Sequence, residues 1–210
     1  MTKANAELVE LFCAKAAVVG ATVHEAASLE AAIQYVVDVC AQKAPCELMA
    51  DEPGTEQGPL GENKVPTRVQ RIVAAPGVDQ KLYDALAKAC EAQGFLCLQD
   101  GLRKRLAGID VGLTEAVLGV AASGTCMVNA DSEEARLASM ISEINVILLR
   151  KSAIRPDLPS IAPDLRALQS TGKAAYTAFI SGPSRTADIE RVPAVGVHGP
   201  LELHIILLED

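Results

Sequence analysis

The chain has 210 residues, of which 50% are hydrophobic and 22% are charged. A typical domain has roughly 100 to 200 residues, so the length predicts a single domain over residues 1–210, and the composition excludes an intrinsically disordered chain. The 27 acidic residues outnumber the 19 basic ones, aromatic residues make up 3%, and Trp is absent. Because such a surface repels phosphate groups, nucleic acid and anionic membranes are not expected partners.

The N-terminal residues do not resemble a secretory signal, because Glu7 and Glu10 interrupt their apolar pattern. The most apolar stretch, residues 116–130, is interrupted by Gly119 and Gly124. It is also too short to cross a hydrocarbon layer about 30 Å thick. We therefore expect no membrane span and a soluble, cytoplasmic protein.

The cysteines are scattered through apolar segments and form no CxxC pair. Zinc and iron–sulfur sites usually show their ligands as close cysteine pairs. We therefore expect small, buried, reduced thiols and no metal or cofactor bound by this chain. The six residues are Cys13, Cys40, Cys46, Cys90, Cys97 and Cys126.

The first half of the chain alternates helical and extended patterns. Apolar spacing predicts helices over residues 5–19, 29–43 and 79–93, with Ser28 as the N-cap of the second. Residues 51–66 contain three Pro, three Gly and no apolar period, which predicts a loop that is either a lid or disordered. Short strands are predicted over residues 21–26, 46–50, 69–74 and 95–98.

The second half contains near-continuous apolar runs, which are typical of strands covered on both faces. These runs are residues 117–122, 126–128, 145–149, 174–180 and 203–208, and helices are predicted over residues 132–140 and 160–171. Strands that alternate with helices pair in parallel through helical crossovers. The predicted fold class is therefore α/β with a mostly parallel sheet.

Ligands of open α/β sheets bind beyond the carboxyl ends of the strands, so polar strand exits are candidate sites. Gly124 and Thr125 form one polar kink, although a β-bulge explains the same residues. Arg150 and Lys151 form a second exit, where two cations can pair with a carboxylate or phosphate or can simply be solvated.

The third exit follows a turn at Gly182 and predicts a short helix that Ser184 caps. Arg185, Thr186 and Asp188 belong to this exit. The helix N-terminus, the hydroxyls and the guanidinium together suit an anion, and a capped helix without a ligand is the structural alternative.

His198 lies in a turn beside Gly199, where an imidazole can donate a hydrogen bond or act as an acid or base. His24 and His204 lie in strand-like surroundings and are predicted to be packing residues. A triad of Ser184, Asp188 and His198 is compatible by residue type, but Ser184 does not lie in a GxSxG elbow. We therefore do not favour hydrolysis.

Several segments resemble the lactate-utilisation protein C family (LutC/YkgG), which is built on the LUD domain. The similarity is strongest over residues 108–208, in the order characteristic of the family. The matching segments are Gly112-Leu113-Thr114, Gly124-Thr125, Leu148-Leu149-Arg150-Lys151-Ser152, Ile180-Ser181-Gly182-Pro183-Ser184, Thr186-Ala187-Asp188-Ile189-Glu190 and Val195-Gly196-Val197-His198-Gly199-Pro200.

This resemblance implies a three-layer α/β sandwich similar to the NagB/RpiA/CoA-transferase-like group. It also implies a role in oxidising L-lactate to pyruvate alongside two partner subunits that carry iron–sulfur clusters, with this chain as the subunit without a cluster. Family members often carry an acidic residue at the position of Ala122. A glutamyl-thioester mechanism like that of CoA transferases is therefore not expected.

These observations lead to one hypothesis, in which the strand-exit loops meet at a common rim and bind a small anionic ligand. The expected binding residues are Gly124, Thr125, Arg150, Lys151, Gly182, Ser184, Arg185, Thr186 and Gly199, with His198 and Asp188 as the acid–base groups. Two alternatives remain open. The chain is either a docking module for iron–sulfur partners without chemistry of its own, or, by fold analogy, an enzyme acting on a sugar phosphate or acyl-CoA.

Overall fold

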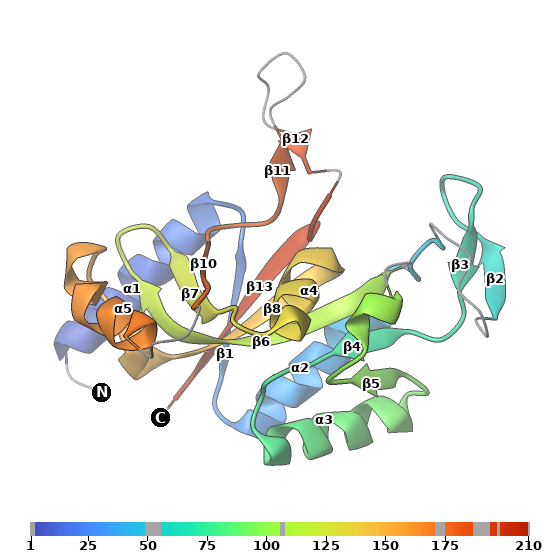
Figure 1. Cartoon of the computed structure of the whole chain (residues 1–210), viewed down its shortest axis with the longest axis horizontal. Helices are drawn as coiled ribbons and strands as arrows, with labels where there is room; N and C mark the ends of the chain where they lie inside the picture. Colours follow the sequence, from blue (N-terminus) through green and yellow to red (C-terminus); the bar gives the residue numbers. More distant parts are fainter. Residues whose placement is uncertain are drawn as a thin grey trace.

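The fold is built on a nine-stranded sheet with a parallel centre (Figure 1). We analysed a computed structural model, which describes residues 3–48, 56–105, 108–170, 175–186, 194–196 and 198–209. Six strands follow one another in the order β1-β13-β8-β6-β4-β5, and every neighbouring pair is parallel. Their bounds are β1 Thr22–Ala26, β4 Ile72–Ala74, β5 Leu96–Leu98, β6 Ile109–Val120, β8 Ser142–Arg150 and β13 Glu202–Leu208.

Strand β6 extends beyond the parallel centre. Its first part pairs with β8, and its last residues pair antiparallel with β7 (Thr125–Asn129). The edge of this extension is β10 (Thr177–Ile180), antiparallel to β7, while the short β9 (Ile154–Arg155) runs parallel to the end of β6. The antiparallel pairing follows from the tight turn between β6 and β7, since parallel neighbours need a long crossover.

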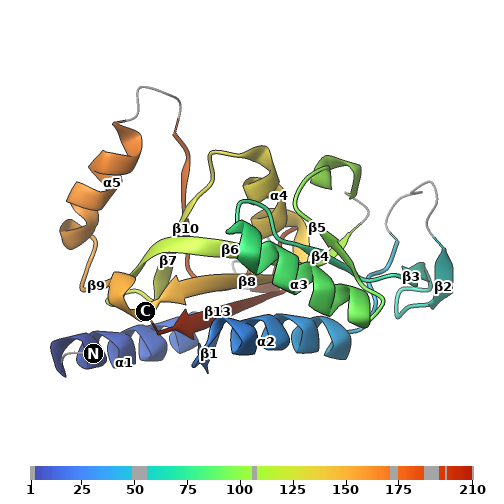
Figure 2. The ribbon, with the colours of Figure 1, turned by 90° about the horizontal axis from the view of Figure 1, so that it is seen from below.

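Helices cover both faces of the sheet, which confirms the predicted α/β class. Apolar residues of α2 and α3 form one cluster with one face, and α1 and α4 pack on the other. Figures 1 and 2 show α2 and α3 side by side. The helices are α1 Lys3–Val18, α2 Leu29–Gln42, α3 Gln80–Ala92, α4 Glu133–Ile141 and α5 Ala162–Gln169, with short 3₁₀ turns at Leu102–Arg105, Lys151–Ala153 and Pro159–Ile161.

Strand β8 shows why the sequence contains near-continuous apolar runs. Val146 and Leu148 pack in the cluster formed with α2 and α3, whereas Ile147 and Leu149 pack in the cluster formed with α1. Successive side chains of a strand point to opposite faces, so a strand covered on both faces needs apolar residues at every position.

Serine side chains cap the N-termini of α2 and α4. The Ser28 Oγ atom accepts a hydrogen bond from the Ala31 amide at 3.2 Å, and Ser132 Oγ accepts one from Ala135 at 3.0 Å. These side chains satisfy amide groups that have no partner within the helix. The predicted N-cap at Ser28 is confirmed.

Two predictions near residues 46–66 are wrong. The predicted loop contains an antiparallel hairpin of β2 (Gln57–Leu60) and β3 (Pro66–Arg68), which projects from one end of the molecule (Figures 1 and 2). The predicted strand over residues 46–50 is reduced to an isolated bridge between Glu47 and Thr67, and residues 49–55 lie outside the described residues.

The predicted helix after Pro183 is also wrong over the residues that the structure describes. Arg185–Thr186 forms β11, which pairs antiparallel with β12 (Ala194–Val195). Asp188, which we expected in the first helical turn, lies outside the described residues. A backbone paired with a neighbouring strand cannot present free helical amides, so the expected helix N-terminus is missing at Ser184.

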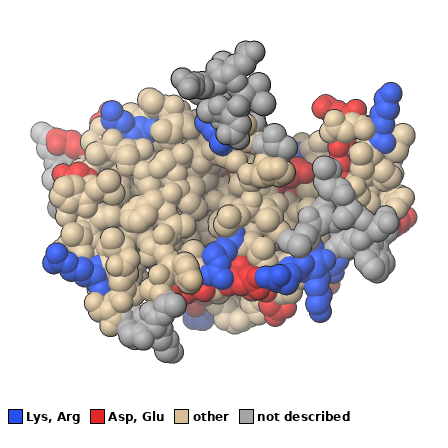
Figure 3. Space-filling view, turned by 45° about the horizontal axis from the view of Figure 1, so that its top comes forward, with Lys and Arg blue, Asp and Glu red and all other residues tan. Residues whose placement is uncertain are grey.

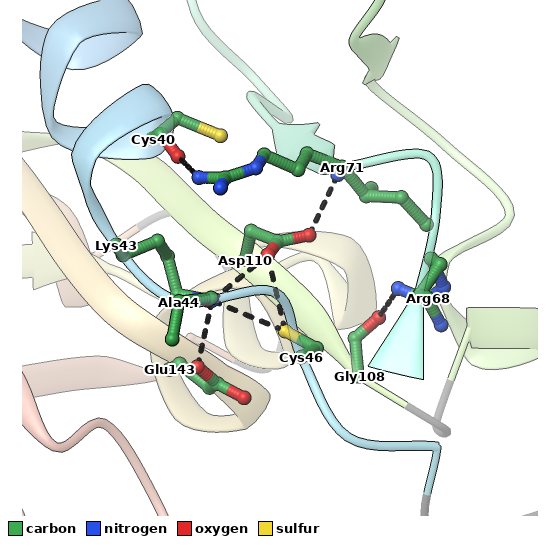
Figure 4. A network of polar contacts seen from close by, with 10 residues as sticks. Cys40, Lys43, Ala44, Cys46, Arg68, Arg71, Gly108, Asp110 and Glu143 are labelled. Carbon is green, nitrogen blue, oxygen red and sulfur yellow. Dashed lines mark hydrogen bonds and ion pairs between the residues drawn. The ribbon is translucent and has the colours of Figure 1, made fainter. Parts of the chain in front are cut away.

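A buried ionic network joins the end of α2 to the start of β6 and β8 (Figure 4). Lys43 Nζ lies 2.8 Å from both Asp110 Oδ1 and Glu143 Oε2, and the Asp110 side chain is 1% exposed. Asp110 Oδ2 also accepts a hydrogen bond from the Ile72 amide at 2.8 Å. The network therefore connects four elements at the amino edge of the sheet.

Candidate functional site

A cavity of about 420 Å³ lies between α4, β10 and the amino ends of β8 and β13. It combines Asn145 on its inner side, Arg136 of α4, and the segment Ser181–Ser184 that leaves β10. We call it the α4–β10 cavity. The side of the molecule that carries α4, β7 and β10 is largely free of charged groups in Figure 3. The polar side chains of this cavity therefore lie within a mostly uncharged surface.

Asn145 is the most informative polar residue of the cavity. It is 1% exposed, and its Oδ1 atom is buried without a hydrogen-bond partner among the described residues. Its strand neighbours are Gly112 of β6 and Leu203 of β13. A buried polar atom without a partner costs about 1 to 3 kcal/mol, so a ligand that donates a hydrogen bond here recovers that free energy.

Arg136 supplies a positive charge that the surrounding backbone holds in place. Its Nη1 atom donates to the carbonyl oxygens of Ala130 at 2.6 Å and Asp131 at 2.9 Å, and its guanidinium lies 5.2 Å from the ring centre of Tyr176. A guanidinium has five N–H donors. The group is thus oriented by its own contacts and retains donors suited to a carboxylate.

The segment leaving β10 is fixed by hydroxyls and by one close backbone contact. Thr125 Oγ1 lies 2.7 Å from Ser123 Oγ and 2.7 Å from Ser181 Oγ, forming a short chain of hydroxyls. Gly182 has a φ of +81°, and a Cβ atom there would lie 2.2 Å from the Val19 carbonyl oxygen. Only glycine fits, so Gly182 is required for packing against the end of α1.

Ser184, His198 and Gly199 lie together, as the hypothesis expects. Ser184 donates through its amide to the Pro200 carbonyl at 2.8 Å and through Oγ to the His198 carbonyl at 2.9 Å. A Cβ atom at Gly199 would lie 2.8 Å from Ser184 Oγ. His198 is exposed, and its main-chain carbonyl fixes the Ser184 side chain, which lines the cavity wall.

Arg185 is exposed and does not line the α4–β10 cavity. A Cβ atom at Gly20 would lie 2.7 Å from an Arg185 guanidinium nitrogen. The guanidinium is therefore beside the residues that follow the C-terminus of α1, an end where a positive charge is favourable. Thr186 pairs with Ala194 in the β11–β12 ladder.

The expectation that all strand exits share a rim is wrong. The amide of Leu201 donates to the Glu143 carbonyl at 2.7 Å, so the Pro200 turn lies at the start of β8, whereas Arg150 ends that strand. Seven residues at about 3.3 Å each separate Glu143 from Arg150 by roughly 23 Å. Our prediction failed because it assigned every glycine-rich turn to the carboxyl edge of the sheet.

Lys151 and Gly124 have structural partners. Lys151 Nζ lies 2.6 Å from carboxylate oxygens of both Glu25 and Glu209. These hydrogen bonds, with Glu209 first, raise the pKa of Lys151 above its ordinary value. At Gly124 a Cβ atom would lie 2.3 Å from the Ala16 amide nitrogen, so this glycine allows α1 to approach the β6–β7 turn.

Sequence reasoning missed Asn145, Arg136 and Tyr176. Asn145 offered a usable signal, because an amide inside the apolar run Ile144–Leu149 is out of place in a buried strand. Arg136 and Tyr176 are far apart in the chain and gave no comparable signal.

Within the described part of the chain, no three His, Cys, Asp or Glu side chains are grouped so that they could hold a metal ion. No helix among these residues has the length and apolar character needed to span a membrane.

Comparison with known proteins places these features in a family context. The YkgG protein of Escherichia coli (strain K12) is 36% identical over 102 residues, which cover 48% of this chain and 44% of that protein. The lactate utilization protein C of Macrococcus caseolyticus (strain JCSC5402) is 32% identical over 136 residues, covering 64% and 56%. The chain thus spans about half the length of the curated relatives it matches.

A crystal structure of a DUF162 family protein from Deinococcus radiodurans has a similar fold. Its TM-score is 0.58 at 16% sequence identity, with 97% of this chain and 98% of that chain covered. At that identity the likeness supports the fold alone. The family profile of the LUD domain matches residues 9–208, which is nearly the whole chain. The chain therefore belongs to the LUD domain family.

Proposed function

We propose that this chain acts in lactate utilisation and holds a small anionic ligand, lactate or pyruvate, in the α4–β10 cavity. Relatives named lactate utilization protein C support the process. The observation that carries the ligand is the buried Oδ1 atom of Asn145, which has no partner among the described residues and lines a cavity next to a guanidinium.

A 2-hydroxy acid suits these groups. Its hydroxyl can donate to Asn145 Oδ1, its carboxylate can pair with Arg136, and its methyl group can lie against apolar wall residues such as Ala178 and Leu203. The corresponding 2-oxo acid offers an acceptor instead of a donor. An amide side chain presents an N–H after a half rotation, so Asn145 can serve both members of the couple.

Calorimetric titration of lactate and pyruvate into the wild type and the Asn145→Leu variant tests this proposal. Leucine keeps the branching of asparagine at Cγ and removes the amide, so we expect affinity for lactate to fall roughly tenfold. The free energy of unfolding should stay within about 0.5 kcal/mol of the wild type or rise, because an unpaired buried polar group is removed. Unchanged affinity would overturn the proposal.

Two arginine variants locate the carboxylate. The proposal assigns it to Arg136, which lines the cavity, in preference to Arg185, whose guanidinium lies beside Gly20. We expect Arg136→Gln to weaken lactate binding by about tenfold and Arg185→Ala to change it by less than about twofold. The reverse order would move the ligand to the Ser184–Arg185 loop and refute the assignment to the cavity.

We also propose that the oxidation proper takes place on partner subunits that carry iron–sulfur clusters, as the family resemblance implies. A docking role without ligand chemistry is the second candidate. It is favoured by exposed apolar side chains around the cavity, among them Met140, Tyr176 and Phe179.

Co-purification separates these two roles. A pure docking module binds its partner subunits equally well with and without lactate and shows no calorimetric signal with lactate alone. A thermal-shift series with sugar phosphates and acyl-CoA covers the fold-based alternative, because a ligand that binds the native state raises the melting temperature. Stabilisation by those compounds and not by lactate would favour a different enzyme class.

A further inference from the structure

Two cysteines meet where α3 turns into the edge strand β5, which lies beside it (Figure 1). Cys90 is buried on the apolar face of α3. Cys97 is the middle residue of β5, is partly exposed, and packs against the same apolar cluster as Cys90. Its strand neighbours Leu96 and Leu98 pack in the cluster on the opposite face of the sheet. Since side chains alternate along a strand, the Cys97 thiol points toward α3.

The turn between α3 and β5 produces this arrangement. The Gly94 amide donates to the Glu91 carbonyl at 2.9 Å. The Phe95 amide donates to the Cys90 carbonyl, also at 2.9 Å. These two hydrogen bonds around a glycine with a φ of +73° form a Schellman motif, which ends the helix and reverses the chain. Phe95 packs in the same cluster as Cys90, and Cys97 follows two residues later on the same face of the strand.

The two thiols share a side-chain hydrogen bond that makes them chemically unequal. This hydrogen bond lowers the pKa of Cys97 against the opposing effect of burial. The same hydrogen bond, and then burial, raises the pKa of Cys90. Cys97 therefore ionises first, and Cys90 keeps its proton. All six cysteines fall within the described ranges, and burial is the main cause that raises the pKa of the other four, which are Cys13, Cys40, Cys46 and Cys126.

We propose that Cys90 and Cys97 form a reversible disulfide on reaction with a peroxide, with Cys97 as the attacking thiolate and Cys90 as the resolving thiol. The Cys97 sulfur attacks one peroxide oxygen, the O–O bond breaks, and the leaving oxygen takes up a proton to become water. The Cys90 sulfur then attacks the sulfenic acid of Cys97, the S–O bond breaks, and a second water leaves with the Cys90 proton. Two thiols and one hydrogen peroxide thus give one disulfide and two waters, with sulfur oxidised and the peroxide reduced.

Cys40 of α2 is the competing partner for Cys90, because it lies in the same cluster. Its charge is a smaller influence on the pKa of Cys90 than the hydrogen bond to Cys97. Cys40 is also fully buried, and burial raises its pKa to about 12. The disulfide is therefore expected within the α3–β5 turn and not between α2 and α3. The inference does not depend on the lactate proposal.

Mass spectrometry of the reduced full chain, treated with a small excess of hydrogen peroxide, tests the proposal. Tryptic cleavage after Lys88 and Arg103 leaves both cysteines in one peptide, residues 89–103. The disulfide should appear as this peptide with two hydrogens fewer, and dithiothreitol should restore them. An unchanged peptide would overturn the proposal. A disulfide that joins this peptide to the one containing Cys40 would also overturn it.

Serine variants assign the two roles. Cys90→Ser keeps a hydrogen-bond donor but removes the resolving thiol, so the sulfenic acid of Cys97 should accumulate and be trapped by dimedone. Cys13, the other partly exposed cysteine, is the internal control and should give at least about tenfold less adduct. Cys97→Ser should leave Cys90 unmodified. Equal labelling of Cys13 and Cys97, or a sulfenic acid on Cys90, would refute the assignment, and the wild-type peptide decides the proposal even if a variant fails to fold.

Discussion

Gly112 shows how a single residue sets the distance between a helix and the sheet. A Cβ atom there would lie 2.0 Å from the Ala138 carbonyl oxygen and 2.8 Å from Ser142 Oγ. Both atoms belong to the end of α4 and its junction with β8, so a methyl group would push α4 away from the sheet. The same helix carries Arg136, which lines the α4–β10 cavity, so a displacement of α4 would also displace this guanidinium.

We predict that Gly112→Ala lowers the free energy of unfolding by about 3 kcal/mol, because overpacking against backbone is relieved only by moving it. Gly101→Ala is the matched control, since its φ is +70° and nothing lies within 4 Å of an added Cβ. That change should cost only about 1 kcal/mol through backbone strain. Urea denaturation measures both, and equal losses would contradict the steric explanation.

For single residues, the sequence predicts which positions require a particular residue type better than it predicts the contacts that these residues make. The sequence predicts that Gly124 and Gly182 belong to a ligand-binding site, whereas the structure places the backbone of Ala16 and Val19 against them. Close approach requires glycine in either case. Which group approaches depends on α1, more than 100 residues away in the chain, and no local pattern contains that information.

The buried network at the end of α2 determines how that helix is anchored. The Lys43 side chain is 8% exposed and lies between Asp110 and Glu143 (Figure 4). Burial alone would lower the pKa of Lys43, but Asp110 and then Cys46 outweigh it, so the pKa lies above the ordinary value of 10.5. The ammonium is therefore charged throughout the neutral range.

We predict that Lys43→Met lowers the free energy of unfolding by about 3 to 5 kcal/mol, because Asp110 is left as an unpaired buried charge. A raised folded-state pKa means that this contribution is fully present below pH 10.5 and is lost as the pH rises through the higher folded value. The difference from wild type should thus be constant from pH 6 to 9. Lys88→Met, on the exposed side of α3, should change stability by less than about 0.5 kcal/mol.

Elements with strong periodicity were predictable, and short exposed ones were not. The helix predicted over residues 29–43 is observed as Leu29–Gln42, because its apolar spacing and its Ser28 cap agree. The β2–β3 hairpin was missed because Gln57–Leu60 buries little apolar surface. Strand β11 has two residues, and its pairing with β12 cannot be recognised from a local pattern.

For the molecule as a whole, the two main apolar clusters share the same strands. Residues of β8 and β13 contribute to both clusters, from opposite faces of the sheet. We predict that the chain unfolds in one cooperative transition, with equal calorimetric and van't Hoff enthalpies in differential scanning calorimetry. Two resolved transitions would contradict the prediction of a single domain over residues 1–210.

The whole-molecule arrangement was the least predictable part of the candidate site. Sequence order predicted a parallel sheet correctly, but it could not assign each turn to an edge. Arg150 follows β8 and Ser184 contacts the turn that precedes β13, so similar polar segments end up at opposite edges. Asn145 lies in the strand between those two edges. Its candidacy as a ligand-binding residue depends on the α4–β10 cavity, which no local sequence pattern predicts.

The most direct test of the central claim is to map where lactate binds. Backbone and side-chain amide shifts of the full chain, recorded during a lactate titration, should change in a saturable way at Asn145, at Thr177–Ile180 and at Ser181–Ser184, and these changes should be strongly weakened in Asn145→Leu. Shifts confined to Glu115 and Arg150 at the carboxyl edge, or no saturable shift at any residue, would contradict the account.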